Sequence, residues 1–147
     1  MKVVLRGSSV LFSMLGFSPT APVQQAPVVL RRGSADRVQI GMSALDVLAE
    51  YRERAKFDER SSKADIFPSI NRRRPEMSLD LREGVVTAIR VYSRRYKTEE
   101  GLGPGDSLIR LANQYPIHWT AEDIAEVHDL NMKFQFEKDR IISVVLS

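Results

Sequence analysis

Hydrophobic residues recur along this chain at helical spacing, separated by polar stretches. In the segment 43–58, Leu45, Leu48 and Tyr51 lie about one turn apart, which predicts an amphipathic helix with a charged outer face. A similar pattern spans 78–98, where the content of β-branched residues makes a strand the alternative for part of the segment. We predict a helix in both places.

The stretch between these two helices, residues 60–77, is polar and contains the run Arg72-Arg73-Arg74, which predicts a linker without regular structure. Linkers of this length are uncommon inside a compact domain. An isolated helix of about four turns is marginal in water, so its apolar face needs a partner. We therefore expect an extended helical arm that lies on another protein.

A turn at Gly105-Asp106 begins a different pattern in the C-terminal third of the chain. The carboxylate of Asp106 is the predicted N-cap of a short helix. The residue before Pro116 is pushed out of the α region, so the helix ends there. The apolar face of this helix is formed by Leu108, Leu111 and Ala112.

A second helix is predicted over 120–131, and a β-branched strand over 140–146. This order of turn, helix, helix and strand resembles the lysin motif (LysM) family, and the block 104–112 matches that family's first motif closely. The resemblance covers roughly residues 92–147. It implies a C-terminal domain of βααβ topology.

In LysM domains, the loops beside the first turn and before the last strand hold sugars of the N-acetylglucosamine type. The resemblance places the corresponding groove at Gly105, Asp106, Ser107, Asp139 and Arg140. Both regions depart from the family pattern, because His128 stands where members usually have Asn and Lys138-Asp139-Arg140 replaces the usual Pro-Gly-Gln. Binding of chitin or peptidoglycan is therefore a disfavoured alternative.

These elements together predict an α+β protein that is mostly helical, with the βααβ LysM-like domain preceded by an extended helical arm. No internal repeat is visible in the sequence. We expect four segments: a tail that resembles a targeting sequence (1–37), the helical arm and linker (38–77), an amphipathic helix (78–98) and the LysM-like domain (99–147).

The net charge of +3 is distributed unevenly. Residues 1–37 carry five basic side chains and one acidic, whereas residues 38–147 carry seventeen basic and eighteen acidic. A tail rich in Ser and Arg predicts a mitochondrial presequence, with residues 30–34 as a suitable processing site. The alternatives are a plastid signal, a secretory signal and an unprocessed cytosolic tail. The near-neutral remainder lacks the broad positive footprint of a nucleic-acid-binding protein.

Residues 105–108 also spell the name of a hydrolase family in which Ser107 would be the nucleophile. A nucleophilic serine needs a base and an oxyanion hole, and the other motifs of that family are absent. His118 and His128 are ten residues apart in a chain without cysteine, a poor arrangement for a metal site. We expect no enzymatic activity, no cofactor, no bound metal and no transmembrane segment.

The function expected from the sequence is that of a non-catalytic structural or accessory subunit of a large mitochondrial assembly, preferably a respiratory-chain or ATP-synthase complex. The alternatives are a glycan-binding LysM module and a mitochondrial ribosomal subunit that contacts RNA through Arg72, Arg73 and Arg74. Candidate residues for contacts with partner proteins are Leu45, Leu48, Tyr51 and Trp119.

Overall fold

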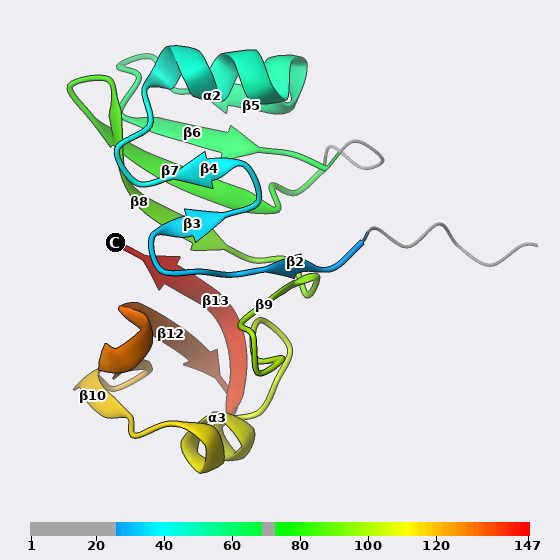
Figure 1. Ribbon diagram of the computed structural model, residues 1–147, viewed down its shortest axis with the longest axis vertical. Helices are drawn as coiled ribbons and strands as arrows, with labels where there is room; N and C mark the ends of the chain where they lie inside the picture. The colour runs from blue at the N-terminus through cyan, green and yellow to red at the C-terminus, as the bar shows by residue number, and fades with distance from the viewer. Residues whose placement is uncertain (1–25, 69–72) are drawn as a thin grey trace, which may run out of the picture.

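The computed structural model describes residues 26–68 and 73–147, which form one antiparallel sheet of eight strands with smaller elements against it (Figure 1). The strand order is β10-β11-β12-β13-β8-β7-β6-β5. The first half of the sheet contains β5 (Ala55–Phe57), β6 (Lys63–Ile66), β7 (Met77–Arg82) and β8 (Val85–Val91). The second half contains β10 (His118–Ala121), β11 (Ile124–Val127), β12 (Met132–Glu137) and β13 (Arg140–Leu146).

The remaining elements are short. Two α-helices, α2 (Ala44–Tyr51) and α3 (Leu108–Gln114), are accompanied by the 3₁₀ turns η1 (Arg52–Arg54) and η2 (His128–Leu130). Two small ladders pair β2 (Val28–Val29) with β9 (Tyr96–Lys97) and β3 (Ser34–Ala35) with β4 (Val38–Gln39). In the part of the chain that the structure describes, no helix has the length and apolar character needed to cross a membrane.

The prediction of a mostly helical protein is wrong, and the segment 78–98 shows why. It contains most of the β7–β8 hairpin, followed by β9. Along β7, buried Met77, Leu79 and Leu81 alternate with more accessible residues, which is the period of a strand. The turn at Glu83-Gly84 has positive φ at both positions, as a tight hairpin requires.

The predicted second helix over 120–131 is also wrong. Its residues form part of the β10–β11 hairpin and the turn η2, so the βααβ topology is not present. Ala125 and Val127 are fully buried and alternate with partly exposed neighbours along β11. The helix after the Gly105 turn is confirmed as α3, although its N-cap is Ser107 rather than the predicted Asp106. The strand over 140–146 is confirmed as β13.

The extended helical arm is wrong as well, because α2 packs on the sheet of its own chain (Figure 1). Val47 and Tyr51, one helical turn apart, are buried and form the inner stripe of α2. Leu45 and Leu48, which were grouped with Tyr51 in one stripe, point outward.

The two halves of the sheet repeat the same arrangement, which the sequence does not reveal. Each half begins with a Gly-X-Ser turn at positive φ, in which the serine side chain caps a short helix: Ser43 caps α2 and Ser107 caps α3. Ser43 then bridges to the first residue of β8, and Ser107 to the first residue of β13. The repeat is hidden because the connection between β6 and β7 is longer than that between β11 and β12.

The hairpins of the two halves also match in detail. Thr87 and Ile142 are the unpaired residues of β-bulges at equivalent places in β8 and β13. The two halves meet where β8 pairs with β13, and Arg90 opposite Val145 is the middle of three residue pairs. The molecule is therefore a tandem repeat whose halves are related by an approximate twofold axis through that central pair.

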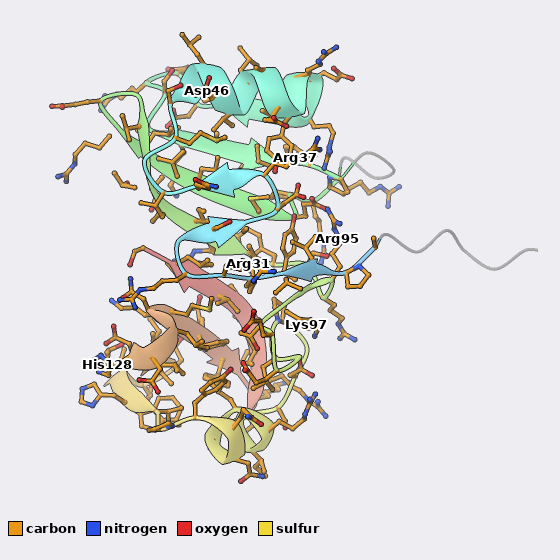
Figure 2. All side chains as sticks on the ribbon, viewed as in Figure 1. Arg31, Arg37, Asp46, Arg95, Lys97 and His128 are labelled. Carbon is orange, nitrogen blue, oxygen red and sulfur yellow. The ribbon has the colours of Figure 1, made fainter. Side chains whose placement is uncertain are left out.

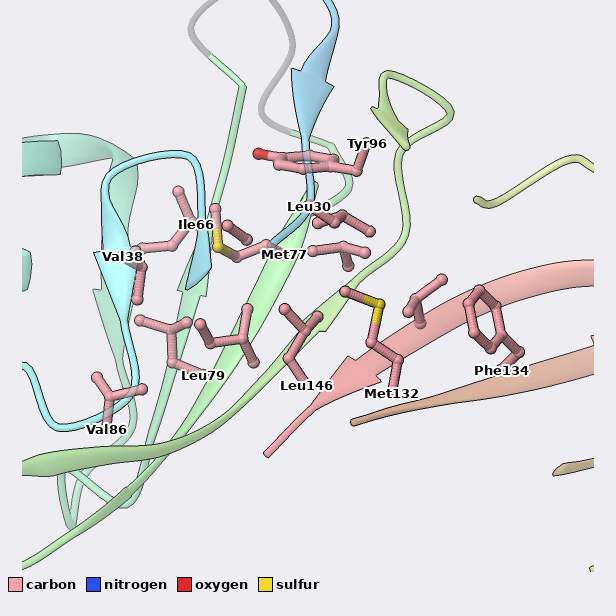
Figure 3. Close-up of a cluster of buried hydrophobic side chains, with 14 of the residues drawn as sticks. Leu30, Val38, Ile66, Met77, Leu79, Val86, Tyr96, Met132, Phe134 and Leu146 are labelled. Carbon is pink, nitrogen blue, oxygen red and sulfur yellow. The ribbon is translucent and has the colours of Figure 1, made fainter. Parts of the chain in front are cut away.

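One continuous core fills the space between the sheet and the elements packed on it. Figure 3 shows buried side chains of both halves in contact with those of the N-terminal segment. Leu30, Ala35 and Val38 from that segment are fully or almost fully buried. Residues 26–37, assigned above to a targeting tail, thus contribute to the folded core, and cleavage within 30–34 would cut through it.

We predict that Leu30→Ala lowers the free energy of unfolding by about 2–5 kcal/mol, because it leaves a cavity in the core. Val29→Ala is the matched control, since the neighbouring side chain is 44% exposed, and we expect a loss below about 1 kcal/mol. Urea denaturation followed by circular dichroism measures both values. Equal losses in the two variants would contradict the structural role of Leu30.

Candidate functional site: an arginine-lined groove

The most distinctive surface feature lies where β8 and β13 separate. Their ladder ends at the pair Val91–Val144, while β13 continues back to Arg140. The space beside the end of the ladder is an open groove with a volume of about 690 Å³. We call it the arginine groove. Its lining residues are Arg74, Tyr92, Arg94, Pro104, Gly105, Arg140, Ile141 and Ile142.

Among the described residues that line the arginine groove, three are arginines and none is acidic. Arg74, Arg94 and Arg140 are exposed, and none of them forms an ion pair among residues 26–68 and 73–147. The side chain of Arg94 lies against Gly105, where an added Cβ would come within 3.0 Å of its Nε. Arg140 makes one long hydrogen bond, from its guanidinium to the carbonyl oxygen of Gly105 at 3.4 Å. The groove therefore concentrates positive charge that is not neutralised by neighbouring carboxylates.

An apolar wall continues the arginine groove on one side. Pro75, Tyr92 and Ile142 line an adjoining hollow together with Arg74. Tyr92 is 38% exposed and Ile142 is 40% exposed. Ile142 belongs to the strand that the sequence predicts correctly, but as a bulge residue it points to the surface and away from the core.

Comparison of the two halves of the sheet shows whether the fold requires these side chains. The position equivalent to Ile142 in the first half is Thr87, whose hydroxyl donates to the carbonyl oxygen of Asp80. The position equivalent to Arg140, at the start of the neighbouring strand, is Val85. Because the same backbone is formed with different side chains, the fold itself does not require an arginine or an exposed isoleucine at these places.

A buried carboxylate lies behind the arginine groove. Glu76 is 3% exposed and accepts hydrogen bonds from Arg95 Nη2 at 2.8 Å, Tyr96 Oη at 2.7 Å and Arg54 Nη2 at 3.3 Å. Burial and the bond to Glu76 raise the pKa of Tyr96, so this hydroxyl stays protonated and donates. Arg95, which lies near β2 in Figure 2, also donates to the carbonyl oxygen of Ala26. The cluster holds the β8–β9 connection, and thereby the backbone of Tyr92 and Arg94, in place.

The five residues of the proposed sugar groove do come together, because the turn before α3 contacts the β12–β13 hairpin. Gly105 N donates to the carbonyl oxygen of Ile141, and Leu108 N to that of Asp139. The carboxylate of Asp106, however, is already bound by Lys97 Nζ at 2.7 Å, Arg110 Nη1 at 2.6 Å and a backbone amide. Ser107 Oγ accepts the N–H of Arg110 as helix cap. These polar groups are engaged in holding the turn.

The candidate contact residues for partner proteins divide into two groups. Tyr51 is a core residue, whose hydroxyl donates to Asp36 Oδ2 at 2.8 Å. Leu45 and Leu48 are 77% and 45% exposed on the outer side of α2. Trp119 lies on the edge strand β10, is 45% exposed and packs against Phe136, with ring centroids 5.7 Å apart. Leu45, Leu48 and Trp119 thus remain available for contacts.

The two histidines are close in space although they are distant in sequence. The ring centroids of His118 and His128 are 5.8 Å apart, and Nε2 of His128 lies 3.9 Å from Glu126 Oε1. Among the described residues, no group of three or more His, Cys, Asp or Glu side chains is arranged to hold a metal ion. In the arginine run, Arg74 lines the groove and Arg72 lies outside the described residues.

Sequence reasoning missed Tyr92, Arg94 and Ile142 as candidate site residues. Tyr92 and Arg94 lie within the predicted helix over 78–98, and Ile142 lies within the predicted strand over 140–146. The signal for Tyr92 and Arg94 is the strand pattern of 85–91, which ends just before Tyr92 and indicates that these two residues follow the strand. Ile142 is turned outward by the bulge in β13, which the strand pattern does not predict.

Comparison with known protein families, with curated proteins and with solved structures finds no match to this chain. The resemblance to the LysM family therefore stays a prediction, which rests on the turn and helix within residues 104–112.

We predict that Asp106→Asn changes the pH dependence of stability. Partial burial opposes ionisation of Asp106, but the hydrogen bonds from Lys97 and Gly103 N and the charges of Lys97 and Arg110 outweigh it, so its pKa is lowered. A lowered pKa in the folded state gives stability that is present above the ordinary carboxyl value of about 4 and is lost as the pH falls below it.

The variant lacks this contribution, so its urea midpoint should be lower than that of the parent at pH 7 and should fall less steeply in acid. Asp129→Asn, at an exposed carboxylate, is the control and should follow the parent curve. Parallel curves for the Asp106 variant and the parent would contradict the assigned role of Asp106 in holding the turn.

Proposed function

We propose that this chain is a non-catalytic accessory subunit of a larger mitochondrial assembly, attached to its partner through the arginine groove. The single observation that carries the proposal is the set of three arginines, exposed and without ion pairs in the described part of the chain, around exposed Tyr92 and Ile142. Unpaired guanidinium groups next to apolar side chains are typical of protein contact surfaces, where Arg and aromatic residues are enriched.

The charge distribution favours a protein partner in a respiratory-chain or ATP-synthase assembly over a ribosome. Residues 38–147 are nearly neutral, with seventeen basic and eighteen acidic side chains, so the positive charge of the groove is local. A protein that follows an RNA backbone usually presents a broad basic surface. The RNA alternative retains one supporting observation, the position of Arg74 in the groove.

A second contact supports the role of a subunit. Leu45 and Leu48 present an apolar pair on α2, and Ile109 at the position equivalent to Leu45 is 71% exposed on α3. These residues lie on two separate helices and do not form one continuous patch (Figure 1). We therefore propose that they add smaller apolar contacts to the main contact at the arginine groove.

The assembly is tested with a tagged full-length chain expressed in cells. We expect the parent to be found in mitochondria and to migrate in a large particle on a native gel. Replacing Arg74, Arg94 and Arg140 together by glutamate should release the protein from that particle, because each reversal replaces attraction by repulsion. Arg82→Glu, on the β7–β8 hairpin, is a single charge reversal outside the groove; it serves as the control and should leave the particle intact.

Migration of the parent at the mass of a single chain would contradict the proposal. Loss of the particle after ribonuclease treatment would favour the RNA alternative instead.

The glycan alternative is tested separately by calorimetry with a chitin hexamer. We expect no measurable binding, because the carboxylate and amide groups near the Gly105 turn already pair with Lys97, Arg110 and each other. Micromolar binding of the chitin hexamer that is lost in Asp106→Asn would support the alternative that this chain is a glycan-binding module. Asp129→Asn again serves as the control.

A further inference from the structure

We propose that the arginine groove binds a short, extended acidic peptide whose carboxylates pair with Arg74, Arg94 and Arg140 and whose central apolar side chain packs on Tyr92 and Ile142. The inference rests on the proposed function, because it names the chemistry of the partner segment at the same site. Three features support the inference: the arginines of the groove, the apolar wall beside it, and the carboxylates on β6 and β7.

The charge pattern of the groove matches carboxylates in an extended chain. The three arginines come from three separate segments, namely the connection before β7, the loop after β8 and the start of β13. An extended peptide advances about 3.3 Å per residue and places side chains on alternate sides, so acidic residues in alternation reach arginines that are spread along a groove. Arginine binds carboxylates with two parallel hydrogen bonds, which gives orientation as well as affinity.

The apolar wall distinguishes a peptide from a bare anion. Tyr92 and Ile142 are exposed on the same side of the groove as Pro75, and Arg74 is the one charged side chain among the described residues that line this hollow. An apolar peptide side chain that covers this wall removes its surface from water, and the gain is proportional to the area buried. Inorganic phosphate or a free carboxylate would leave the wall uncovered.

The neighbouring acidic groups limit the length of the ligand. The hydroxyl of Tyr92 donates to Ser78 Oγ at 3.2 Å, and Ser78 donates to Asp65 Oδ1 at 2.8 Å. Asp80 follows on the same face of β7. A long polyanion that left the groove across β7 and β6 would meet these carboxylates, whereas a short acidic segment would end before them. This favours a peptide over a nucleic acid strand.

The test measures fluorescence anisotropy of a labelled glutamate-rich peptide with two central leucines, using the purified full-length protein. The parent protein should bind it, and binding should weaken with added salt because the groove is open to solvent. Arg94→Glu and Arg140→Glu should each weaken binding at least about tenfold, the factor expected for a charge-assisted hydrogen bond. Arg82→Glu, the distant control, should bind like the parent.

Two further probes separate the parts of the proposal. The same peptide with glutamine in place of glutamate should not bind, and Ile142→Thr, which copies the equivalent Thr87, should weaken binding of the leucine peptide but not of an all-glutamate peptide. Equal binding of the glutamine and glutamate peptides would overturn the inference. Tighter, arginine-dependent binding of an oligouridine of equal charge would overturn it in favour of RNA.

The inference and the proposed function fail in different ways. If the triple arginine variant is released from the native particle but no acidic peptide binds the parent protein, the proposed subunit role stands. The proposal that the partner segment is an acidic peptide is then wrong. If acidic peptides bind but the parent chain migrates alone, the groove is a peptide site and the assembly proposal is wrong. Circular dichroism of each variant confirms that the fold is retained.

Discussion

The arrangement of this chain depends on one buried carboxylate. Glu76 receives the guanidinium groups of Arg54 and Arg95 and the hydroxyl of Tyr96, which come from two different parts of the sequence, the turn η1 and the adjacent pair Arg95-Tyr96. A charge that is almost completely removed from water must be paired, and loss of one partner leaves the others uncompensated. Through Arg95, which also holds the carbonyl oxygen of Ala26, the same carboxylate fixes the N-terminal strand against the sheet.

The pairing of Glu76 with Arg95 also determines which arginines of this region remain on the surface. Arg94 and Arg95 are adjacent in sequence, yet Arg95 is turned inward by Glu76 while Arg94 faces the groove. Glu76 therefore pairs with Arg95 in the interior, while Arg94 stays outside without an ion pair among the described residues. Arg74, two residues before Glu76, is left on the outside in the same way.

The sequence predicts the α3 helix and the β13 strand correctly, because capping and β-branching there agree with the tertiary fold. It fails at β7–β8, where Leu81, Val85 and Ile89 recur every four residues as on one face of a helix. In the structure the hairpin turn separates Leu81 from Val85, and the bulge at Thr87 leaves Val85 exposed while Ile89 is buried. Of the residues that line the arginine groove, Arg74, Gly105 and Arg140 are the ones that the sequence predicts as candidate site residues. The groove arises from a long-range pairing of β8 with β13, and no local pattern encodes which surface residues such a pairing brings together.

The seam between the two halves has a consequence for folding. Every other ladder of the main sheet joins strands that follow each other in sequence, and such hairpins form within about 1–10 μs. The three-pair ladder of β8 and β13 closes a long loop, so its formation costs more chain entropy, and we expect it to form after the hairpins. The groove takes Tyr92 from one side of this seam and Ile142 from the other. A ligand seated there bridges both halves, and its binding energy adds directly to the energy that holds them together.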